Sequence, residues 1–388
     1  MTKKGDEIRF LLQGRIDSDN ASAVEQDIMA TLEGGENLPL VLDAQDLKYI
    51  SSSGLRRLLR VRKKHPDVVI ENVGSDVYEI LDMTGFTQMM TVKKAYRTID
   101  ITGCPEIGRG ANGVIYRIDR DNVVKVFSKD NALDEIMRER ELARNALILG
   151  IPTAISYDVV KVGDYYGSVF ELLDAIPFNR IIAEDPSKVD WCVAESVKLL
   201  KKIHSIHVPE GKLPRTMTKF MTWVRRIKEY IPEEPYERLC ELVAAIPEDN
   251  RLLHNDFHTG NLMLLDDEVL LIDMETISSG NIIFEFATMY ASYMGFSELD
   301  PENAMSFLGY DHKTSARIFR RSLELYFETD DRGRLEYIED KVRLVGYVRM
   351  LDHTLRHKGI QSSEGRRAVD FWKEKIVSGL DRVDTLKI

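Results

Sequence analysis

The segment HNDFHTGNLMLLDDEVLLIDME, residues 254–275, carries His254, Asp256, Asn261 and Asp273 within one short stretch. None of these four polar side chains suits an apolar core, because a buried carboxylate or amide needs a partner. The letters LMLL and VLLI flank the acidic group DDE, a pattern typical of a β-hairpin. The segment therefore predicts a hairpin with chemically useful residues before and after it.

The hairpin predicts which of these side chains lie together. If a three-residue turn centres on Asp267, Asn261 stands opposite Asp273 at the open end of the hairpin. An amide oxygen and a carboxylate are hard oxygen ligands of the kind that Mg²⁺ binds. Asp256 precedes them by a short loop, where its carboxylate can accept the proton of an incoming hydroxyl. His254 is more readily interpreted as a hydrogen-bonded organiser of this loop than as a catalytic base.

A glycine-rich segment upstream predicts a phosphate clamp. In IGRGANGVIYRIDRDNVVKVF, residues 107–127, the glycines Gly108, Gly110 and Gly113 allow backbone N–H groups to approach phosphates without a Cβ in the way. A dinucleotide-binding fingerprint would open a helix after the last glycine. Here the letters VIYRI and NVVKVF predict two strands instead, and this context favours a loop of the protein-kinase type.

Lys125 lies on the second of these predicted strands, where its ammonium can reach phosphate oxygens while Val123 on the same face borders the nucleotide base. A lysine in an apolar strand needs an anionic partner. The following helix, from about residue 133 to 149, places Glu139 inside its apolar stripe, so we expect Glu139 to be that partner. Glu135 and Glu141 are weaker candidates.

Three motifs together carry a family resemblance: GxGxxG with a following strand lysine, HxDxxxxN as HNDFHTGN, and the aspartate of LIDME after the hairpin. In this order they resemble the aminoglycoside phosphotransferase and choline kinase branch of the protein-kinase-like fold. The resemblance covers roughly residues 104–388. Asn255 stands where that branch usually has glycine, and Glu285 in FEFA where an aspartate is common. The letters DME replace the usual aspartate followed by tryptophan or phenylalanine, and we expect all three departures to bear on substrate identity.

The resemblance implies a two-lobed domain over residues 104–388, with an N-terminal lobe over about 104–173 and a C-terminal lobe over about 174–388. ATP and Mg²⁺ are the implied cofactors. The backbone from about Glu171 to Leu173 is implied to contact adenine.

The first part of the chain alternates predicted strands and helices and resembles a second family. The stretches LVLDAQDLKYISSSGLRRLL, residues 40–59, and VVIENVGSDVYEILDMTGFTQMMTV, residues 68–92, resemble the STAS domain of anti-sigma factor antagonists. In that family an aspartate precedes a serine or threonine that signalling members phosphorylate. Here Ser51 replaces the aspartate, and Ser52 aligns with the candidate regulatory phosphosite. Alternatively, Ser52 or Ser53 only caps the following helix, which is basic on one face.

Composition limits the class of protein. The chain has 388 residues and a formal net charge of −11, most of it beyond residue 98. This balance argues against nucleic-acid binding and mildly favours a cationic small substrate through electrostatic steering. No apolar run approaches a membrane span, and the segment MTKKGDEIRF does not resemble a signal peptide, so we expect a cytoplasmic protein without membrane contact.

The expected fold class is α+β: a STAS domain over residues 1–98 with a small mixed sheet and helices, then a two-lobed kinase-like domain over 104–388. The expected function is ATP- and Mg²⁺-dependent phosphate transfer to a hydroxyl of a small molecule, with a regulatory or partner-binding STAS domain. One alternative is a protein serine kinase acting on a STAS serine, and another is a non-catalytic nucleotide-sensing scaffold. Only METISSGNII separates Asp273 from the next apolar helix, which disfavours a long peptide-docking segment.

Overall fold

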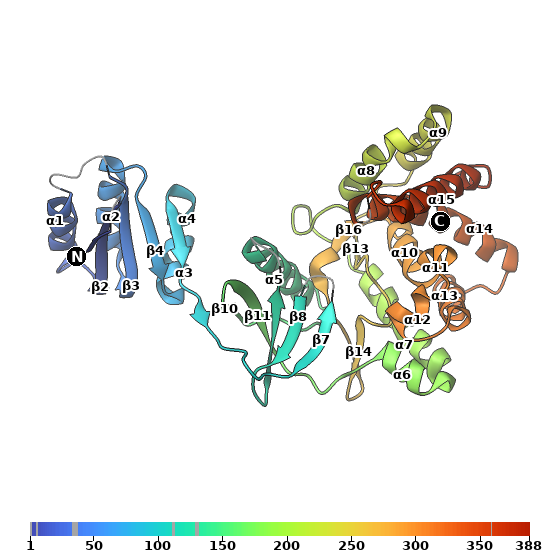
Figure 1. Cartoon of the computed structure of the whole chain (residues 1–388), viewed down its shortest axis with the longest axis horizontal. Coiled ribbons are helices and arrows are strands. Elements are labelled where there is room, and N and C mark those ends of the chain that lie inside the picture. The colour runs from blue at the N-terminus through green and yellow to red at the C-terminus, as the bar shows by residue number, and fades with distance from the viewer. Residues whose placement is uncertain (1, 5–6, 33–37, 111–112, 129–131, 358) are drawn as a thin grey trace. The chain divides into compact units, whose positions relative to one another are not determined.

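The computed structural model describes residues 2–4, 7–32, 38–110, 113–128, 132–357 and 359–388 (Figure 1). The chain divides into two compact units. The first comprises residues 1–104 with 126–128 and 158–168, and the second comprises 105–125, 129–157 and 169–388. The expected domain limits at residues 98 and 104 remain predictions, because each of the two units is made of several separate stretches of the chain.

The first unit is built on a five-stranded sheet in the order β1-β2-β3-β4-β5. Strand β1 pairs antiparallel with β2, whereas β2, β3, β4 and β5 are parallel neighbours, so the sheet is mixed. The strands are β1 (Thr2–Lys4), β2 (Glu7–Ile16), β3 (Leu40–Ile50), β4 (Val69–Val73) and β5 (Thr91–Lys94). Strand β3 continues to pair with β2 as far as Ile50.

Helices bury the apolar side of this sheet. They are α1 (Ala21–Thr31), α2 (Ser52–Lys64), α3 (Ser75–Met83) and α4 (Phe86–Met89). Ile8, Leu12 and Ile16 of β2 are buried in one core with Leu55 and Leu58 of α2. These residues are four apart in the strand and three apart in the helix. At these spacings the side chains lie on the same face of their strand or helix.

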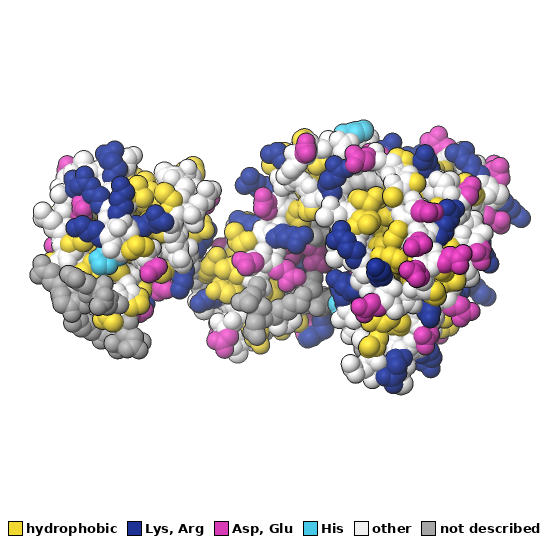
Figure 2. Space-filling model, turned by 90° about the horizontal axis from the view of Figure 1, so that it is seen from above, with side chains coloured by type: hydrophobic (Ala, Val, Ile, Leu, Met, Phe, Trp, Pro, Cys, Tyr) yellow, Lys and Arg dark blue, Asp and Glu magenta, His cyan; other side chains and the backbone are white. Residues whose placement is uncertain are grey.

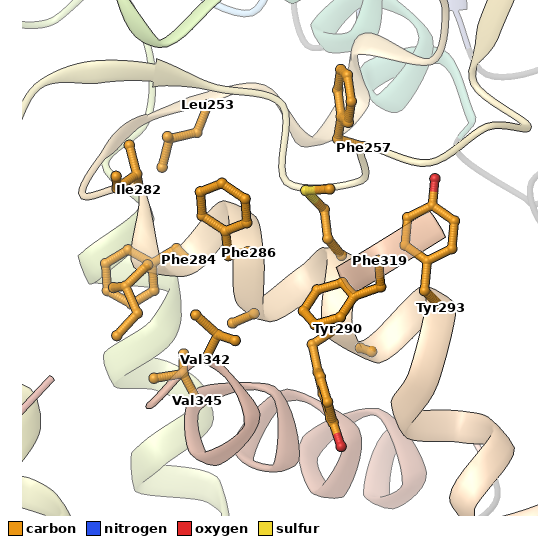
Figure 3. Packing of buried hydrophobic residues seen from close by; sticks show 14 of the residues in the cluster. Leu253, Phe257, Ile282, Phe284, Phe286, Tyr290, Tyr293, Phe319, Val342 and Val345 are labelled. Carbon is orange, nitrogen blue, oxygen red and sulfur yellow. The ribbon is translucent and has the colours of Figure 1, made fainter. Parts of the chain in front are cut away.

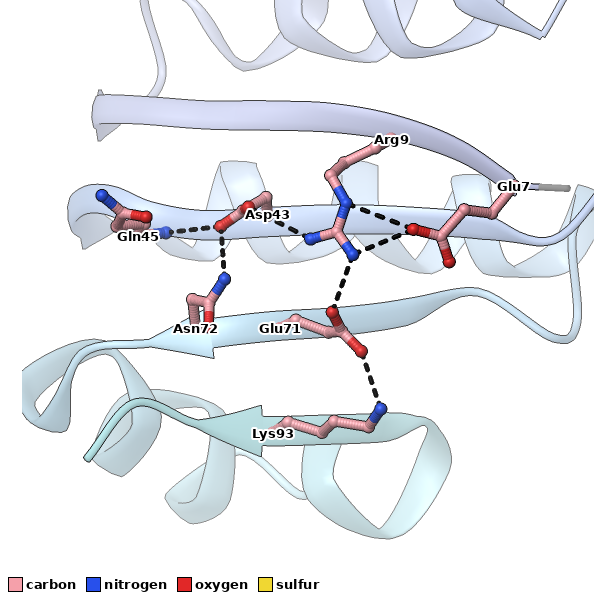
Figure 4. A network of polar contacts seen from close by, with 7 residues as sticks. All are labelled: Glu7, Arg9, Asp43, Gln45, Glu71, Asn72 and Lys93. Atoms are coloured by element: carbon pink, nitrogen blue, oxygen red, sulfur yellow. Dashed lines mark hydrogen bonds and ion pairs between the residues drawn. The ribbon is translucent and has the colours of Figure 1, made fainter. Parts of the chain in front are cut away.

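The opposite face of the sheet carries a polar network (Figure 4). Arg9 of β2 donates to Glu7 at 3.0 Å, to Asp43 of β3 at 3.2 Å and to Glu71 of β4 at 3.1 Å. Lys93 of β5 donates to the other oxygen of Glu71 at 2.7 Å. Charged side chains therefore cross four adjacent strands on the side of the sheet away from the helices.

A six-stranded sheet follows in the order β6-β10-β11-β9-β8-β7. Its strands are β6 (Arg97–Thr98), β7 (Glu106–Gly110), β8 (Gly113–Arg117), β9 (Asn122–Phe127), β10 (Asp158–Val162) and β11 (Tyr165–Glu171). Strands β7 and β8 form an antiparallel hairpin in which Gly110 faces Gly113. Helix α5 (Ala132–Ile148) follows β9, within one residue of its predicted bounds.

The remainder of the second unit is mainly helical. Its helices are α6 (Phe178–Glu184), α7 (Val189–His204), α8 (Thr216–Arg226), α9 (Glu233–Ala244), α10 (Ile283–Tyr290), α11 (Phe296–Leu299), α12 (Asn303–Leu308), α13 (His312–Phe327), α14 (Arg332–His357) and α15 (Ser363–Leu380). Two small sheets are formed by β12 (Ile176–Pro177), β14 (Leu262–Leu265) and β15 (Glu268–Leu271), and by β13 (Arg251–Leu253) and β16 (Ser278–Gly280). A mixed sheet with helices is thus followed by an antiparallel sheet and a helical lobe, which confirms the predicted class.

An apolar core lies beneath the segment around Asp256 (Figure 3). Leu253 and Phe257, which flank this segment, are buried in one cluster with Ile282 and Phe286 of the α10 region and with Tyr293. Buried side chains on both sides of a polar loop restrict the positions that the loop can take. None of the helices in the described ranges combines the length and apolar character that a membrane crossing requires.

Candidate active site

A buried carboxylate fixes the start of the loop that carries Asp256. Glu285 of α10 is 0% exposed, and its two oxygens accept the backbone N–H groups of His254 at 2.6 Å and of Asn255 at 2.8 Å. The ring of His204 lies 3.5 Å from the same carboxylate. Because a charged acceptor strengthens both hydrogen bonds, Glu285 holds the backbone immediately before Asp256.

Asn255 occupies a left-handed backbone conformation, with φ of 59°. Asparagine tolerates this region better than most side chains, which explains how it can stand where the related pattern usually has glycine. Its side-chain amide donates to Ser278 Oγ at 2.6 Å and to the Thr276 carbonyl at 3.2 Å. The loop is thereby tied to the segment that follows Asp273.

Asp256 lies among three groups that stabilise its charged form. Arg349 Nη2 is 3.6 Å from Oδ1, His258 Nε2 is 3.5 Å from Oδ2, and Asn261 Nδ2 is 3.3 Å from Oδ2. The N–H of Gly260 donates to His258 Nδ1, which leaves the ring proton on Nε2, toward Asp256. Burial alone would raise the pKa of Asp256, but the hydrogen bond from His258 and the charge of Arg349 outweigh it. The net effect holds the pKa well below its ordinary value, so Asp256 is ionised at neutral pH.

The side-chain amide of Asn261 is oriented by the loop itself. Nδ2 donates to the backbone oxygen of Asp256 at 2.9 Å. Since the two ends of an amide point in different directions, this bond turns Oδ1 away from Asp256 and presents it as an acceptor. Asn261 Oδ1 is therefore left to accept from a group other than Asp256.

The predicted register of the β14–β15 hairpin is wrong by one residue. Leu265 faces Glu268 across a turn formed by Asp266 and Asp267, and the backbone N–H of Ile272 donates to Asn261 O at 2.9 Å. Asn261 therefore stands opposite Ile272 instead of Asp273. The turn is shorter than expected because Asp266 adopts a left-handed conformation with φ of 52°, which a two-residue turn requires.

Asp273 leaves the hairpin in a left-handed conformation, with φ of 65°, and a short 3₁₀ turn, Met274–Thr276, follows. Its Oδ1 is buried without a hydrogen-bond partner among the described residues. A buried oxygen without a hydrogen-bond partner lowers the stability of the fold unless a ligand contacts it. Desolvation and the nearby charge of Asp273 raise the pKa of Glu275 to about 7, which indicates an excess of negative charge at this end of the site.

These observations fit a hard cation held by few protein ligands. Asp273 offers an unpartnered carboxylate oxygen and Asn261 an amide oxygen, both suited to Mg²⁺. Within the described ranges, no group of three or more His, Cys, Asp or Glu side chains is arranged to hold a metal. A Mg²⁺ ion bound here would therefore take further oxygens from water and from a nucleotide, as Mg²⁺ commonly does.

Lys125 and Glu139 form a close ion pair between β9 and α5. Lys125 Nζ lies 2.9 Å from Oε1 and 3.1 Å from Oε2 of Glu139, and the two side chains are 17% and 13% exposed. Burial alone would lower the pKa of Lys125, but the charges of Glu139 and Asp273 raise it above the ordinary value. The structure thus brings together the expected pair, Lys125 and Glu139.

The remaining predicted nucleotide contacts lie on the six-stranded sheet. Gly108 and Gly110 are in β7 and Gly113 begins β8, while residues 111–112 lie outside the described residues. Val123 of β9 is buried. Glu171 ends β11 and Leu173 follows it, and the N–H of Leu172 between them donates to Asp121 O at 2.7 Å, so this amide already has a partner. The nucleotide roles of these residues remain predictions.

In the first unit, the helix cap differs from the expectation. Ser51 is the N-cap of α2, and its Oγ accepts the N–H of Gly54 at 3.3 Å, so neither Ser52 nor Ser53 is the cap. Ser52 is the first residue of α2 and is exposed. The helix also exposes basic side chains, and Figure 2 shows Lys and Arg side chains gathered on the first unit. The exposed ones on α2 are Arg56, Arg60, Lys63 and Lys64.

Two residues that organise the site were not predicted from the sequence as site residues. Arg349 belongs to α14, almost one hundred positions after Asp256, and no local motif marks it. Glu285 was noted only as a departure from a family pattern. Its position within the apolar letters IIFEFATMY was a usable signal, because a carboxylate in a buried helix needs strong donors.

Comparison with known families gives two matches. Residues 104–319 match the phosphotransferase enzyme family, and residues 1–100 match the STAS domain. A curated relative of the first part is BtrV of Bordetella bronchiseptica, named as an anti-sigma factor antagonist. It is 35% identical over 85 residues, which are 21% of this chain and 72% of that protein.

Solved structures also resemble the chain at low sequence identity. The ADP-bound aminoglycoside phosphotransferase APH(2'')-Ib is 17% identical, with 79% of this chain and 99% of that chain covered and a TM-score of 0.48. A choline/ethanolamine kinase family protein from Mesorhizobium loti is 12% identical, with 73% and 89% covered and a TM-score of 0.44.

Proposed function

The chain belongs to the phosphotransferase enzyme family and includes an N-terminal STAS domain, and from this membership and the site geometry we propose that it transfers the γ-phosphoryl group of ATP to a hydroxyl of a small molecule. Mg²⁺ would be the metal. The STAS domain would regulate this activity or bind a protein partner. We further propose a cytoplasmic location.

The observation that best supports this function is the difference in surroundings between two carboxylates, Asp256 and Asp273. On one side, Asp256 is ionised and surrounded by donors. On the other, Asp273 has an oxygen without a hydrogen-bond partner among the described side chains and backbone. A carboxylate surrounded by donors, such as Asp256, suits the role of proton acceptor. A carboxylate without donors, such as Asp273, suits the role of metal ligand.

On the acceptor side, Asp256 would orient the incoming hydroxyl by accepting its hydrogen bond. Its low pKa makes it a weak base in the ground state, so the proton would pass to it late, as the hydroxyl oxygen bonds to phosphorus. His258 and Glu285 act before that step by fixing the side chain and the backbone of the loop. Most of the rate enhancement would come from this positioning.

On the nucleotide side, Lys125 held by Glu139 would contact phosphate oxygens, and Asn261 with Asp273 would hold Mg²⁺. Bound Mg²⁺ supplies neutralisation of the charge that develops on the transferred phosphoryl group. Gly108, Gly110 and Gly113 would cover the phosphates. Val123 would border the base, and backbone groups at Glu171 and Leu173 would contact adenine.

A protein serine kinase that acts on a STAS serine is the second candidate, because Ser52 is exposed at the first position of α2. The segment after Asp273 disfavours it. This segment forms a 3₁₀ turn and then β16 (Ser278–Gly280), which pairs with β13, and α10 begins at Ile283. Little chain is left to dock a peptide. A non-catalytic nucleotide-sensing scaffold is the third candidate, and the intact Lys125, Asp256, Asn261 and Asp273 set favours turnover over it.

The test is a phosphate-transfer assay on the full chain with ATP and Mg²⁺, against a panel of hydroxyl compounds and purified STAS proteins. Wild-type transfer to a small molecule that Asp256→Asn abolishes would support the proposal. Transfer to STAS proteins alone would favour the protein-kinase candidate. Nucleotide binding without transfer to any member of the panel, and without ATP hydrolysis, would favour the scaffold.

A further inference from the structure

Thr259, which follows Asp256 by three residues in the same loop, is anchored to three other parts of the chain. It is 1% exposed. Its N–H donates to Tyr293 Oη at 3.0 Å, and its carbonyl accepts the N–H of Asn179 of α6 at 3.1 Å. Its hydroxyl shares a hydrogen bond of 2.7 Å with the hydroxyl of Tyr310. Every polar group of Thr259 is therefore bonded to a residue outside the loop.

The two tyrosines are themselves fixed in the helical lobe. Tyr293 is 2% exposed and lies in the π-helical turn Ala291–Gly295, and Figure 3 shows its hydroxyl directed toward the loop of Phe257. Tyr310 is 5% exposed and follows α12, whose C-cap Gly309 has a φ of 82°. A left-handed glycine ends the helix at this point, and the next ring packs in the core. Buried rings leave their hydroxyls little freedom of position.

Thr259 connects these anchors to the imidazole of His258. Because the two residues are adjacent, a shift of Thr259 moves the His258 carbonyl, which accepts the N–H of Asn261 at 2.9 Å. The same shift moves Gly260, whose N–H donates to His258 Nδ1 at 3.1 Å. The other ring nitrogen, Nε2, lies 3.5 Å from Asp256 Oδ2. The orientation of the Asp256 carboxylate therefore depends on where Thr259 is held.

We propose, on the basis of the function above, that Tyr310 is a positioning residue of the phosphate transfer. Its hydroxyl holds Thr259, and Thr259 holds the imidazole that orients Asp256 toward the acceptor hydroxyl. Without this hydrogen bond the loop keeps its other contacts, but the carboxylate is no longer confined to one orientation. A loss of orientation lowers the rate of transfer to a bound acceptor.

Water competes with the acceptor for the phosphoryl group. In transfer, the acceptor oxygen bonds to the γ-phosphorus, the bond from that phosphorus to the β,γ-bridging oxygen breaks, ADP leaves, and the hydroxyl proton passes to Asp256. In hydrolysis, a water oxygen takes the place of the acceptor oxygen, and the products are ADP, inorganic phosphate and one proton released to solvent. Because water is small and needs less orientation, a misplaced carboxylate slows transfer more than hydrolysis.

Hydrogen–deuterium exchange of the full chain without ligands measures the anchoring. Tyr310→Phe removes only the hydroxyl, and the backbone N–H groups of residues 259–261 should exchange about three to ten times faster, as for one lost hydrogen bond. The control is Tyr347→Phe, which removes a hydroxyl that donates to Glu298 at 3.0 Å from a ring that is 3% exposed. It should leave exchange at 259–261 unchanged. Unchanged exchange in Tyr310→Phe, or equal acceleration in both variants, would overturn the proposal.

The ratio of hydrolysis to transfer measures the effect on the reaction, and it does not depend on the fraction of enzyme that is folded. It is measured with ATP, Mg²⁺ and whichever compound of the panel above accepts phosphate fastest. Tyr310→Phe and Thr259→Val should each raise the ratio at least about fivefold, because each removes one partner of the same hydrogen bond. Thr259→Ser keeps the hydroxyl and should restore the wild-type ratio, which Tyr347→Phe should also show. The double variant should be no worse than the worse single variant.

The remaining outcomes separate this proposal from the proposed function. Faster exchange in Tyr310→Phe with an unchanged ratio would mean that the hydrogen bond holds the loop without guiding transfer, and would overturn the proposal. An equal rise of the ratio in Thr259→Ser and Thr259→Val would do the same, since the hydroxyl would then be irrelevant. If wild type transfers phosphate to water alone, the exchange comparison decides. Absence of both transfer and hydrolysis in wild type would contradict the proposed function instead, whatever the exchange shows.

Discussion

Glu285 Oε2 accepts the backbone N–H of His254 at 2.6 Å, so a fully buried carboxylate of α10 holds the segment that carries Asp256. The variant Glu285→Gln keeps the size of the side chain but replaces one acceptor oxygen with a donor that must face an N–H group. We expect the free energy of unfolding to fall by about 2 to 3 kcal/mol, as for a lost hydrogen bond to a charged group. Transfer activity should fall with it because Asp256 shifts. Thermal unfolding and kcat measure the two effects, with exposed Glu336→Gln as the control.

Asp256→Asn should separate transfer from nucleotide binding. The amide cannot accept a proton, so kcat should fall by roughly 10² to 10⁴, the usual contribution of a positioned base. Affinity for ATP and Mg²⁺ should persist, because Asn261 keeps its hydrogen bond to the backbone oxygen of residue 256. Titration calorimetry beside steady-state kinetics checks both. Loss of ATP binding with a retained rate would show that the roles of Asp256 and Asp273 are exchanged.

Asp273→Ala should remove Mg²⁺-dependent nucleotide binding without harming the fold. Since Asp273 Oδ1 has no hydrogen-bond partner among the described residues, its removal costs no contact there, and the Tm without ligand should fall only by the strain of alanine at the positive φ of this position. The Tm increase that ATP and Mg²⁺ produce in wild type should disappear. The exposed Glu268→Ala should keep that increase. Wild-type turnover in Asp273→Ala would refute the metal assignment.

Arg9→Met should make the first unit less sensitive to acid. Burial would raise the pKa of Asp43, but hydrogen bonds from Asn72, Gln45 and Arg9 lower it. Lys93 and, to a smaller extent, Arg9 lower the pKa of Glu71. Carboxyls with depressed folded-state pKa values stabilise the fold above their unfolded-state pKa, near about 4, and this contribution is lost as the pH falls through the folded-state value.

Wild type should therefore exceed Arg9→Met in stability at pH 7, and the difference should shrink below about pH 4. Thermal unfolding of both proteins across this range is the measurement. The exposed Lys63→Met on α2 is the charge-matched control. A difference that does not depend on pH would mean that Arg9 acts through packing alone.

Ser52 should not be the main phosphate acceptor of the protein. The site is exposed at the start of α2, where a phosphate would be favoured, but the short segment between Asp273 and α10 leaves little room for a protein substrate. Mass spectrometry after incubation with ATP and Mg²⁺ should find at most substoichiometric phosphate on Ser52. Stoichiometric phosphate that Asp256→Asn abolishes would favour the protein-kinase candidate.

Local sequence patterns predicted the elements well but could not set every register. The strands β14 and β15 are apolar on both faces, so the pattern LMLL-DDE-VLLI fits a two-residue and a three-residue turn equally. The left-handed conformation of Asp266 decides between them. Similarly, Ser51, Ser52 and Ser53 can all cap a helix, and only the hydrogen bond to Gly54 distinguishes Ser51.

Contacts between distant segments were the least predictable part of the site. The Lys125–Glu139 pair could be expected because both residues lie in recognisable elements and each needs the other. Arg349 could not, because a charged residue in a long helix usually faces solvent and nothing in its neighbourhood marks the tertiary contact with Asp256. Its role depends on how α14 packs against the loop.

The pairing of β6 with β10 affects how the protein can be divided. Residues Arg97 and Thr98 lie beside Val160 and Lys161 in parallel register, Ile99 N–H donates to Lys161 O at 2.9 Å, and Arg97 pairs with Asp158 at 3.2 Å. A truncated protein that starts at residue 99 would lose β6 and turn β10 into an open edge with unpaired backbone groups, a known cause of self-association. For expression of the phosphotransferase-family part alone, the cut should therefore come before Arg97.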